Sequence, residues 1–194
     1  MSWRAHLEQS LNRFRHDATG VAAVEFALIL PIMLLLYIGA VEASSLISMD
    51  RRVQTIAGTM GDLVARANGK ISACEIKDYF QAASGIMAPY PVGDTKQIVT
   101  SVFVKPNGTT EIAWSKAAGG ATPHVAGQTY PLPAEMKAIS LNTYVIVSEA
   151  TYDYLPITGF IYEEAIQLRR ENFFLTRFEG AIDINPTSTA ACPG

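Results

Sequence analysis

The side chains that most often carry enzyme chemistry are few and scattered in this sequence. Three histidines occur, His6, His16 and His124, and no two have the spacing of metal ligands or of a base beside a nucleophile. The motifs HExxH, GxSxG, GxGxxG and the P-loop are absent, and the adjacent acids Glu163 and Glu164 have no histidine near them in the sequence. We therefore predict that the protein is not an enzyme and has neither a metal nor a cofactor.

The two cysteines, Cys74 and Cys192, show no CxxC or Cys/His spacing that would indicate a metal site. Both follow the apolar segment described below, and an oxidising compartment would allow them to form one disulfide. Closing a loop of that length stabilises a fold by about 4 to 5 kcal/mol in the loop-entropy model. We predict a Cys74–Cys192 disulfide, with two unpaired thiols as the alternative.

One acidic residue, Glu25, is conspicuous because its neighbours are apolar. Every residue from Phe26 to Val41 is uncharged. Adding Gly20 to Val24 brings the segment to about 20 residues, the length that crosses a bilayer, but then includes Glu25. A carboxylate there costs on the order of 2.5 to 3.5 kcal/mol on insertion scales. Glu25 therefore needs a shallow position, a proton or a charged partner, and the residues alone leave these alternatives open.

The apolar segment fits a membrane anchor better than a cleaved signal peptide. Arg4, Arg13 and Arg15 precede it, as they would in either kind of segment. However, the run exceeds the apolar core of roughly 7 to 15 residues that is usual in signal peptides, and only residues 42–45 resemble a weak cleavage site. We predict one transmembrane helix, here assigned to residues 21–45.

Helical periodicity continues beyond this segment and ends at Asn68-Gly69. Apolar residues recur at i, i+3, i+4 and i+7 spacing: Val53, Ile56, Ala57, Met60, Leu63, Val64 and Ala67. We predict a single helix from about Val21 to Ala67, roughly 70 Å long at about 1.5 Å per residue. Its second part, residues 46–67, is expected to form an amphipathic stem.

The orientation of the helix follows from the lengths of the two ends rather than from charge. Three arginines precede the span, and Arg51, Arg52 and Arg66 follow it. The numbers of arginines on the two sides are therefore equal, and the positive-inside rule does not decide the orientation. A short tail is the easier end to leave in the cytoplasm. We expect residues 1–20 to be a cytoplasmic basic leader and residues 68–194 to form a domain in the periplasm.

The first part of that domain reads as a helix and a hairpin. Ser72 and Glu75 have the spacing of a capping box, which predicts a helix that continues to Met87. Strands are predicted at 97–104 and 109–114 because β-branched residues flank a Pro-Asn-Gly turn.

The second part of the domain contributes more strand and a long loop. Residues 115–133 are rich in Gly, Ala and Pro and are expected to form a surface loop without a motif, whereas 142–154 and, more weakly, 164–178 are expected to be strands. One face of the strand at 142–154 is expected to be core: Tyr144, Ile146, Ala150, Tyr152 and Tyr154. The fold class predicted is α+β, an antiparallel sheet covered on one face by helices.

The charge of the chain excludes one class of partner. The formal net charge is only -3 and the basic residues are scattered, which gives no surface for a nucleic acid. Because 49% of the residues are hydrophobic, the chain can bury a sizeable core.

The residues around Glu25 form a longer pattern. Phe14 to Pro31 reads FRHDATGVAAVEFALILP, and Gly39 and Glu42 follow at fixed distances. This pattern resembles the N-terminal signature of the TadE/TadG-like proteins, which are pilin-like components of the tight-adherence (Tad) pilus system, a branch of type IV pili. Residues 13–67 carry the resemblance, and similarity near Tyr152 to Pro156 is looser.

The resemblance implies how the N-terminal residues act. In type IV pilins a prepilin-type peptidase cuts after a glycine, here Gly20, and leaves a new first residue, here Val21. A glutamate five residues into the mature chain, here Glu25, pairs with the new amine of a neighbouring subunit, which would offset part of the desolvation cost of both charges. Val21 departs from the aromatic first residue of typical pilins.

These observations give one leading hypothesis and two alternatives. The leading hypothesis is a minor pilin-like or assembly component of a Tad-type pilus and secretion system in a bacterial inner membrane. Its expected partners are other Tad components or pilin-like subunits, the prepilin-type peptidase and membrane lipid. The alternatives are a stand-alone, membrane-anchored periplasmic binding domain and a secreted hydrolase whose N-terminal segment is removed.

Overall fold

The computed structural model describes residues 19–91, 95–156, 164–178 and 180–185 of the 194-residue chain. The chain divides into two compact units, residues 1–45 and 46–194. The predicted leader at residues 1–20 falls almost entirely outside the described residues, as do His6, His16, Glu163 and Cys192.

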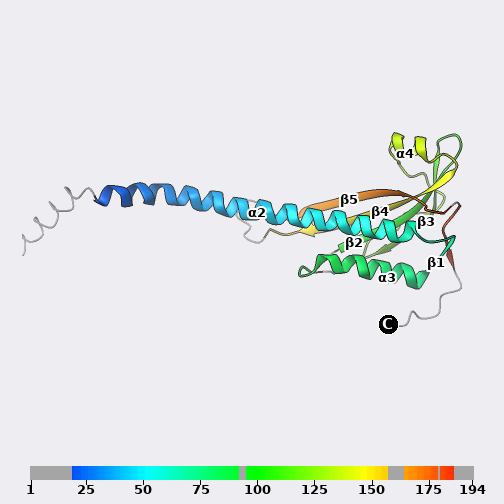
Figure 1. The fold of residues 1–194 in the computed structure, drawn as a ribbon, viewed down its shortest axis with the longest axis horizontal. Helices are drawn as coiled ribbons and strands as arrows, with labels where there is room; N and C mark the ends of the chain where they lie inside the picture. Colours follow the sequence, from blue (N-terminus) through cyan, green and yellow to red (C-terminus); the bar gives the residue numbers. More distant parts are fainter. Residues whose placement is uncertain (1–18, 92–94, 157–163, 179, 186–194) are drawn as a thin grey trace, which may run out of the picture. The chain divides into compact units, whose positions relative to one another are not determined.

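Helix α2 (Thr19–Ala65) begins in the first unit and continues into the second without a break (Figure 1). In the first unit its large apolar side chains are exposed, for example Phe26 at 63% and Leu28 at 69%. An 18-residue stretch has a mean hydropathy of 2.5 and none of it is buried. The helix is therefore long and apolar enough to cross a membrane, and it ends two residues before the predicted Ala67.

The second unit is built around a four-stranded antiparallel sheet with the order β3-β2-β4-β5. The strands are β2 (Thr95–Val104), β3 (Thr110–Ala118), β4 (Thr143–Tyr154) and β5 (Ile166–Leu175). β5 confirms the strand that was predicted weakly at 164–178. β3 runs four residues past the predicted end, into what was expected to be loop.

Short elements complete this unit. β1 (Lys70–Ser72) and β6 (Asp183–Asn185) form a separate parallel pair, and α4 (Ala134–Ile139) lies between β3 and β4 in the chain. The sequence pattern predicted none of these three. With helix α3 (Ala73–Ser84) and the 3-10 turn η1 (Gly85–Met87), the architecture is α+β, as predicted.

Helix α3 begins at the predicted capping box. The Ser72 hydroxyl accepts a hydrogen bond from the Glu75 amide at 3.1 Å, and the Glu75 carboxylate accepts one from the Ser72 amide at 2.7 Å. The two bonds satisfy amides that have no partner inside the helix. The hydrogen bond from the Ser72 amide, aided by the Ser72 side chain, also lowers the pKa of the Glu75 carboxyl.

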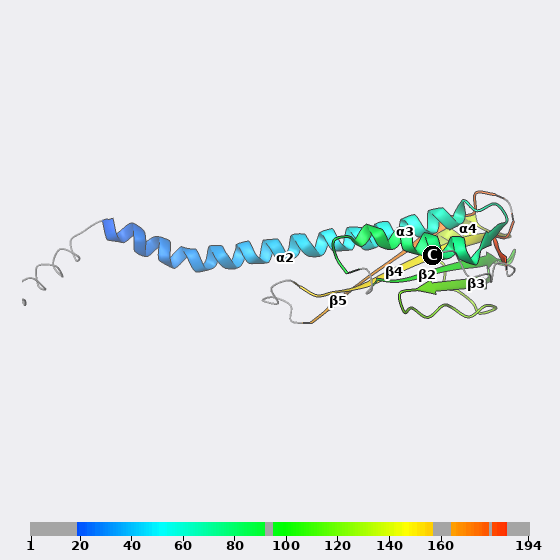
Figure 2. The same cartoon turned by 90° about the horizontal axis from the view of Figure 1, so that it is seen from below.

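One face of the sheet packs against α3 and the C-terminal part of α2, which lie side by side (Figure 2). Five of the predicted periodic residues of α2, Val53, Ile56, Ala57, Met60 and Val64, are each at most 1% exposed here, whereas the predicted Leu63 is half-buried. A Cβ atom on Gly61 would lie 2.3 Å from the Phe174 ring, so the glycine allows α2 and β5 to approach closely. We call this side of the sheet the helix-covered face.

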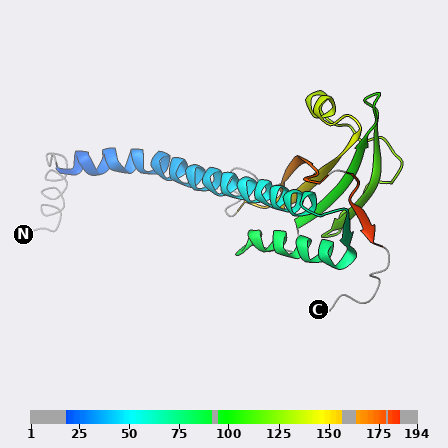
Figure 3. The same cartoon turned by 45° about the vertical axis from the view of Figure 1, so that its right-hand side comes forward.

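The other face of the sheet is covered by the chain that connects β3 to β4, which includes α4. Figure 3 shows α4 and α3 on opposite sides of the strands. A second apolar cluster forms there from Val102, Val104, Ile112, Tyr130, Leu132, Val145 and Val147. We call this side the loop-covered face. The two long helices cover one face of the sheet, as expected, but the second face is also buried, under a connection that includes the short helix α4.

Candidate functional site

The predicted processing and pairing residues lie in the exposed, apolar part of α2. Gly20 and Val21 are in its first turns, with Val21 57% exposed, and Glu25 is exposed one turn further on. Apart from the backbone of its own helical turn, no atom of the described residues lies within 4 Å of the position that a Cβ on Gly20 would occupy. In a bilayer, this surface presents apolar side chains and one carboxylate to lipid or to a neighbouring helix. Cleavage after Gly20 and pairing by Glu25 stay predictions.

The predicted disulfide also stays a prediction. Cys74 is the second residue of α3, next to the capping box, and Cys192 lies outside the described residues.

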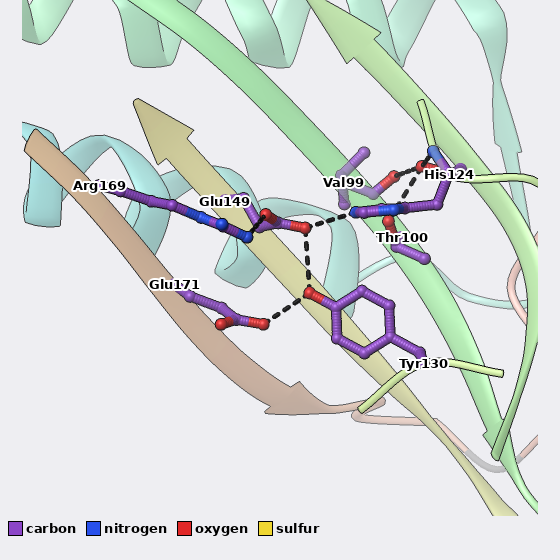
Figure 4. Close-up of polar contacts among 8 residues, drawn as sticks. Val99, Thr100, His124, Tyr130, Glu149, Arg169 and Glu171 are labelled. Carbon is purple, nitrogen blue, oxygen red and sulfur yellow. Dashed lines mark hydrogen bonds and ion pairs between the residues drawn. The ribbon is translucent and has the colours of Figure 1, made fainter. Parts of the chain in front are cut away.

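A polar cluster on the loop-covered face brings together residues that the sequence pattern did not connect (Figure 4). Its centre is Glu149 on β4, whose side chain is only 5% exposed. Arg169 and Glu171 come from the neighbouring strand β5, where Glu171 is directly opposite Glu149. His124 and Tyr130 come from the segment between β3 and α4.

Glu149 holds this cluster together through both carboxylate oxygens. Its Oε1 is 2.7 Å from His124 Nε2 and 3.0 Å from the Tyr130 hydroxyl, and its Oε2 is 2.5 Å from Arg169 Nη2. A carboxylate only accepts hydrogen bonds, so the Nε2 of His124 carries a proton in this arrangement. Three donors from two different segments therefore meet on one buried acid.

The electrostatics of the cluster favour an ionised Glu149. Burial by itself raises the pKa of a carboxyl, but the hydrogen bonds from His124, Tyr130 and Arg169 outweigh it and lower the pKa of Glu149. The pKa of Tyr130 is raised, first by burial and then by its hydrogen bond to Glu171 at 2.6 Å. Because its hydroxyl carries one proton, Tyr130 serves only one of the two carboxylates at a time.

An open hollow of about 450 Å³ borders this cluster. Arg169, His124 and Glu149 line it together with Lys96 and Gln167. Lys96 pairs with Asp153 at 3.0 Å, and Gln167 donates to the same carboxylate at 3.1 Å. The charged side chains that line the hollow thus have partners, Arg169 within the lining and Lys96 outside it, and the cluster attaches a loop to two strands.

The described residues do not bring together a recognisable metal site. No group of three or more His, Cys, Asp or Glu side chains among them is placed to hold a metal ion. His124 was correctly placed in a loop by the sequence, but its partner Glu149 is 25 residues away on another element. The available signal was a glutamate on a strand face that alternation assigns also to Val145 and Val147.

Comparison with known proteins gives one match. A family model described as TadE-like protein matches residues 20–58. The match covers the apolar part of α2 with Glu25 and Glu42, and it lies within residues 13–67, on which the resemblance depended. No curated protein and no solved structure matches the chain.

The matched segment begins at the predicted cleavage position and ends within the part of α2 that packs on the sheet. The TadE-like family is a structural and assembly family associated with the Tad pilus. Residues 20–58 of this chain are thus similar to the TadE-like family, and this similarity points to a Tad pilus-associated membrane protein.

Proposed function

We propose that the protein is a minor pilin-like or assembly component of a Tad-type pilus and secretion system. It is anchored in the bacterial inner membrane by α2, with the N-terminus in the cytoplasm and the second unit in the periplasm. The observation that carries the proposal is Glu25, an acid on an exposed apolar helix surface inside the TadE-like segment.

The proposed mechanism uses the low dielectric of the membrane. A prepilin-type peptidase cuts between Gly20 and Val21, which creates an amine at the start of the apolar helix. The carboxylate of Glu25 on one subunit then pairs with that amine on the next. Two opposite charges attract strongly where water is absent, and each removes part of the other's desolvation cost.

The domain in the periplasm makes the remaining contacts in this proposal. Its two buried faces hold the sheet rigid, and its edges and loops are available to other Tad components. The stand-alone binding domain is the second candidate, and the hollow beside Arg169 is the observation that favours it.

The decisive experiment replaces Glu25 with glutamine in the full chain. The amide keeps the size of the side chain and removes its charge, so membrane insertion should be unchanged or slightly easier. Loss of a charge-assisted contact of roughly 1 to 5 kcal/mol should reduce pilus production or subunit cross-linking by about fivefold or more. Glu164→Gln, the same substitution at an exposed site in the second unit, is the matched control.

Two measurements make the result interpretable. Membrane fractionation shows whether the variant is anchored at the normal level, and N-terminal sequencing of the mature protein shows whether Val21 is the first residue. Gly20→Lys should block processing and retain the leader. Normal pili from an anchored Glu25→Gln variant would contradict the pairing role, and a mature protein that begins after about residue 45 would favour the secreted-hydrolase alternative.

A further inference from the structure

A groove of about 590 Å³ lies between α3 and the C-terminal end of β3, away from the polar cluster. Its apolar lining includes Ile76 and Phe80 from α3 and Ala118 from β3. Lys77 lines it from α3, and Lys116 from β3. This groove belongs to neither the membrane segment nor the hollow beside Arg169.

The position of the groove in the fold leaves it open to a partner. β3 is an edge strand, with β2 on one side and no further strand of the four-stranded sheet on the other. Lys116 and Ala118 are paired with Val99 and Gln97 of β2, and Val99 belongs to the core under the helices. Lys116 and Ala118 therefore share the helix-covered face, the same side as α3.

The length of the groove suits a short protein segment. The residues of α3 that line it run from Ala73 to Ser84, the whole helix, at spacings of three or four. Twelve helical residues extend about 16 to 18 Å, which equals about five residues of extended chain.

The two lysines give the groove a charge preference. Both are exposed, and neither has an ion pair within the described residues. Lys96 of β2 and Lys105, the first residue after β2, pair by contrast with Asp153 and Glu111. The apolar strip is thus flanked from two elements by cations without a counter-charge, which favours an occupant that supplies carboxylates on either side of apolar side chains.

We propose that the α3–β3 groove is a docking site for a segment of a partner protein that presents apolar side chains between carboxylates. This inference rests on the proposed function, because that function places the groove and its partner in the periplasm. It adds to the proposed function a surface that recognises the partner. The chain's own residues 186–194 contain no acidic side chain, so they cannot place carboxylates on both sides of an apolar segment. An anionic lipid would meet the lysines but would not require the apolar strip between helix and strand.

Site-specific photo-cross-linking of the full chain in its own cells tests the proposal. Benzoylphenylalanine replaces Gln81, an exposed residue of α3 that lines the groove. The matched control places it at Ala138, an exposed residue of α4 on the other side of the sheet. We expect an adduct from position 81 alone, and mass spectrometry should locate it in a segment of another protein that has at least two carboxylates beside apolar residues.

Charge variants decide whether the lysines recognise that segment. The double variant Lys77→Glu/Lys116→Glu should reduce the adduct from position 81 at least tenfold, whereas Lys77→Arg/Lys116→Arg should retain it. Thermal unfolding of both double variants should match that of the parent, because all four substitutions are at exposed sites.

The proposal would be overturned if position 81 gave no adduct, or if the adduct were with residues 186–194, with lipid or with a second copy of this chain. It would also be overturned if the cross-linked segment had no carboxylates. An adduct that survived charge reversal of the two lysines would overturn it as well. The test is separable from that of the proposed function, because it reports an adduct rather than pili. Normal pili from the Glu25→Gln variant would contradict the pairing role of Glu25 but would not change the interpretation of the adduct.

Discussion

The two faces of the four-stranded sheet are built from the same strands but are buried by different means. On the helix-covered face, α2 and α3 supply apolar side chains at helical spacing, and the core there includes Val53, Met60 and Phe80. On the loop-covered face, a long connection and the short α4 cover a smaller apolar cluster, and Glu149 with its partners lies beside it.

This difference between the two faces shows what a helix and a loop each need in order to cover a sheet. A helix places an apolar residue over the sheet every three or four positions without a specific contact at each one. A loop has no such period, so it must be attached at individual points. His124 and Tyr130 provide two of these points, and both use the same buried carboxylate.

Identical substitutions on the two faces of β2 should show this difference most strongly. Val99 lies in the helix-covered core and Val102 in the loop-covered cluster, and both are 0% exposed. Val99→Ala should lower the free energy of unfolding by roughly 2 to 3 kcal/mol, because packed helices relax little into the cavity. Val102→Ala should cost about 1 kcal/mol less, since a loop can move inward.

Denaturant unfolding of the full chain in detergent, followed by near-UV circular dichroism, measures both values. Equal losses for the two variants would show that the loop is held as rigidly as the helices, and the contrast between the faces would then be one of composition alone.

Removing the charge of Glu149 should have the next largest effect. Glu149→Gln weakens three hydrogen bonds to a buried anion and should lower the free energy of unfolding by about 1 to 2 kcal/mol at neutral pH. Asp153→Asn is the matched control, because Asp153 lies on the same strand and face but is 40% exposed and pairs with Lys96. An exposed pair of this kind contributes about 0 to 1 kcal/mol.

The stabilisation that the charge of Glu149 provides should decrease at low pH. The pKa of Glu149 is lowered in the folded protein, so its contribution to stability is complete above the pKa of an unfolded glutamate. The contribution disappears as the pH falls from there through the folded pKa. The difference in the free energy of unfolding between the parent and Glu149→Gln should therefore become smaller below about pH 4.5. If this difference in the free energy of unfolding stayed constant down to pH 3, Glu149 would stabilise the fold by packing rather than by its charge.

The sequence predicted the helix-covered face more completely than the loop-covered face. Periodicity alone placed Val53, Ile56 and Met60 on one side of α2, and they are buried. The capping box gave the first turn of α3, and alternation placed Tyr152 and Tyr154 in the core. These features depend on neighbours within about one helical turn or one strand, so a local pattern is sufficient to predict them.

The loop-covered face could not be predicted in the same way. Residues 115–133 have no period, and their attachment depends on a contact between His124 and a strand residue far along the chain. The same reason applies to β1 and β6, which pair across more than 100 residues. Alternation indicated that Thr143 to Thr151 has a second face, but only the fold shows that Val145, Val147 and Glu149 on that face are buried.

The smallest expected effect, from Tyr130→Phe, separates the two roles of this tyrosine. The ring contacts the apolar cluster and makes an edge-on contact with His124 at 5.2 Å between ring centroids, and both contacts survive the substitution. Only the hydroxyl is lost, with its bonds to Glu149 and Glu171. Glu149 keeps His124 and Arg169, and Glu171 is partly exposed and can bind water, so the free energy of unfolding should fall by about 0.5 to 1 kcal/mol. Tyr130→Ala is the comparison, because it also removes the ring and should cost roughly 3 to 5 kcal/mol, as large-to-small core changes do. If Tyr130→Phe destabilised the protein as much as Glu149→Gln, the hydroxyl rather than the arginine or the histidine would be the main partner of the buried acid, and the attachment of the loop would depend on a single hydrogen bond.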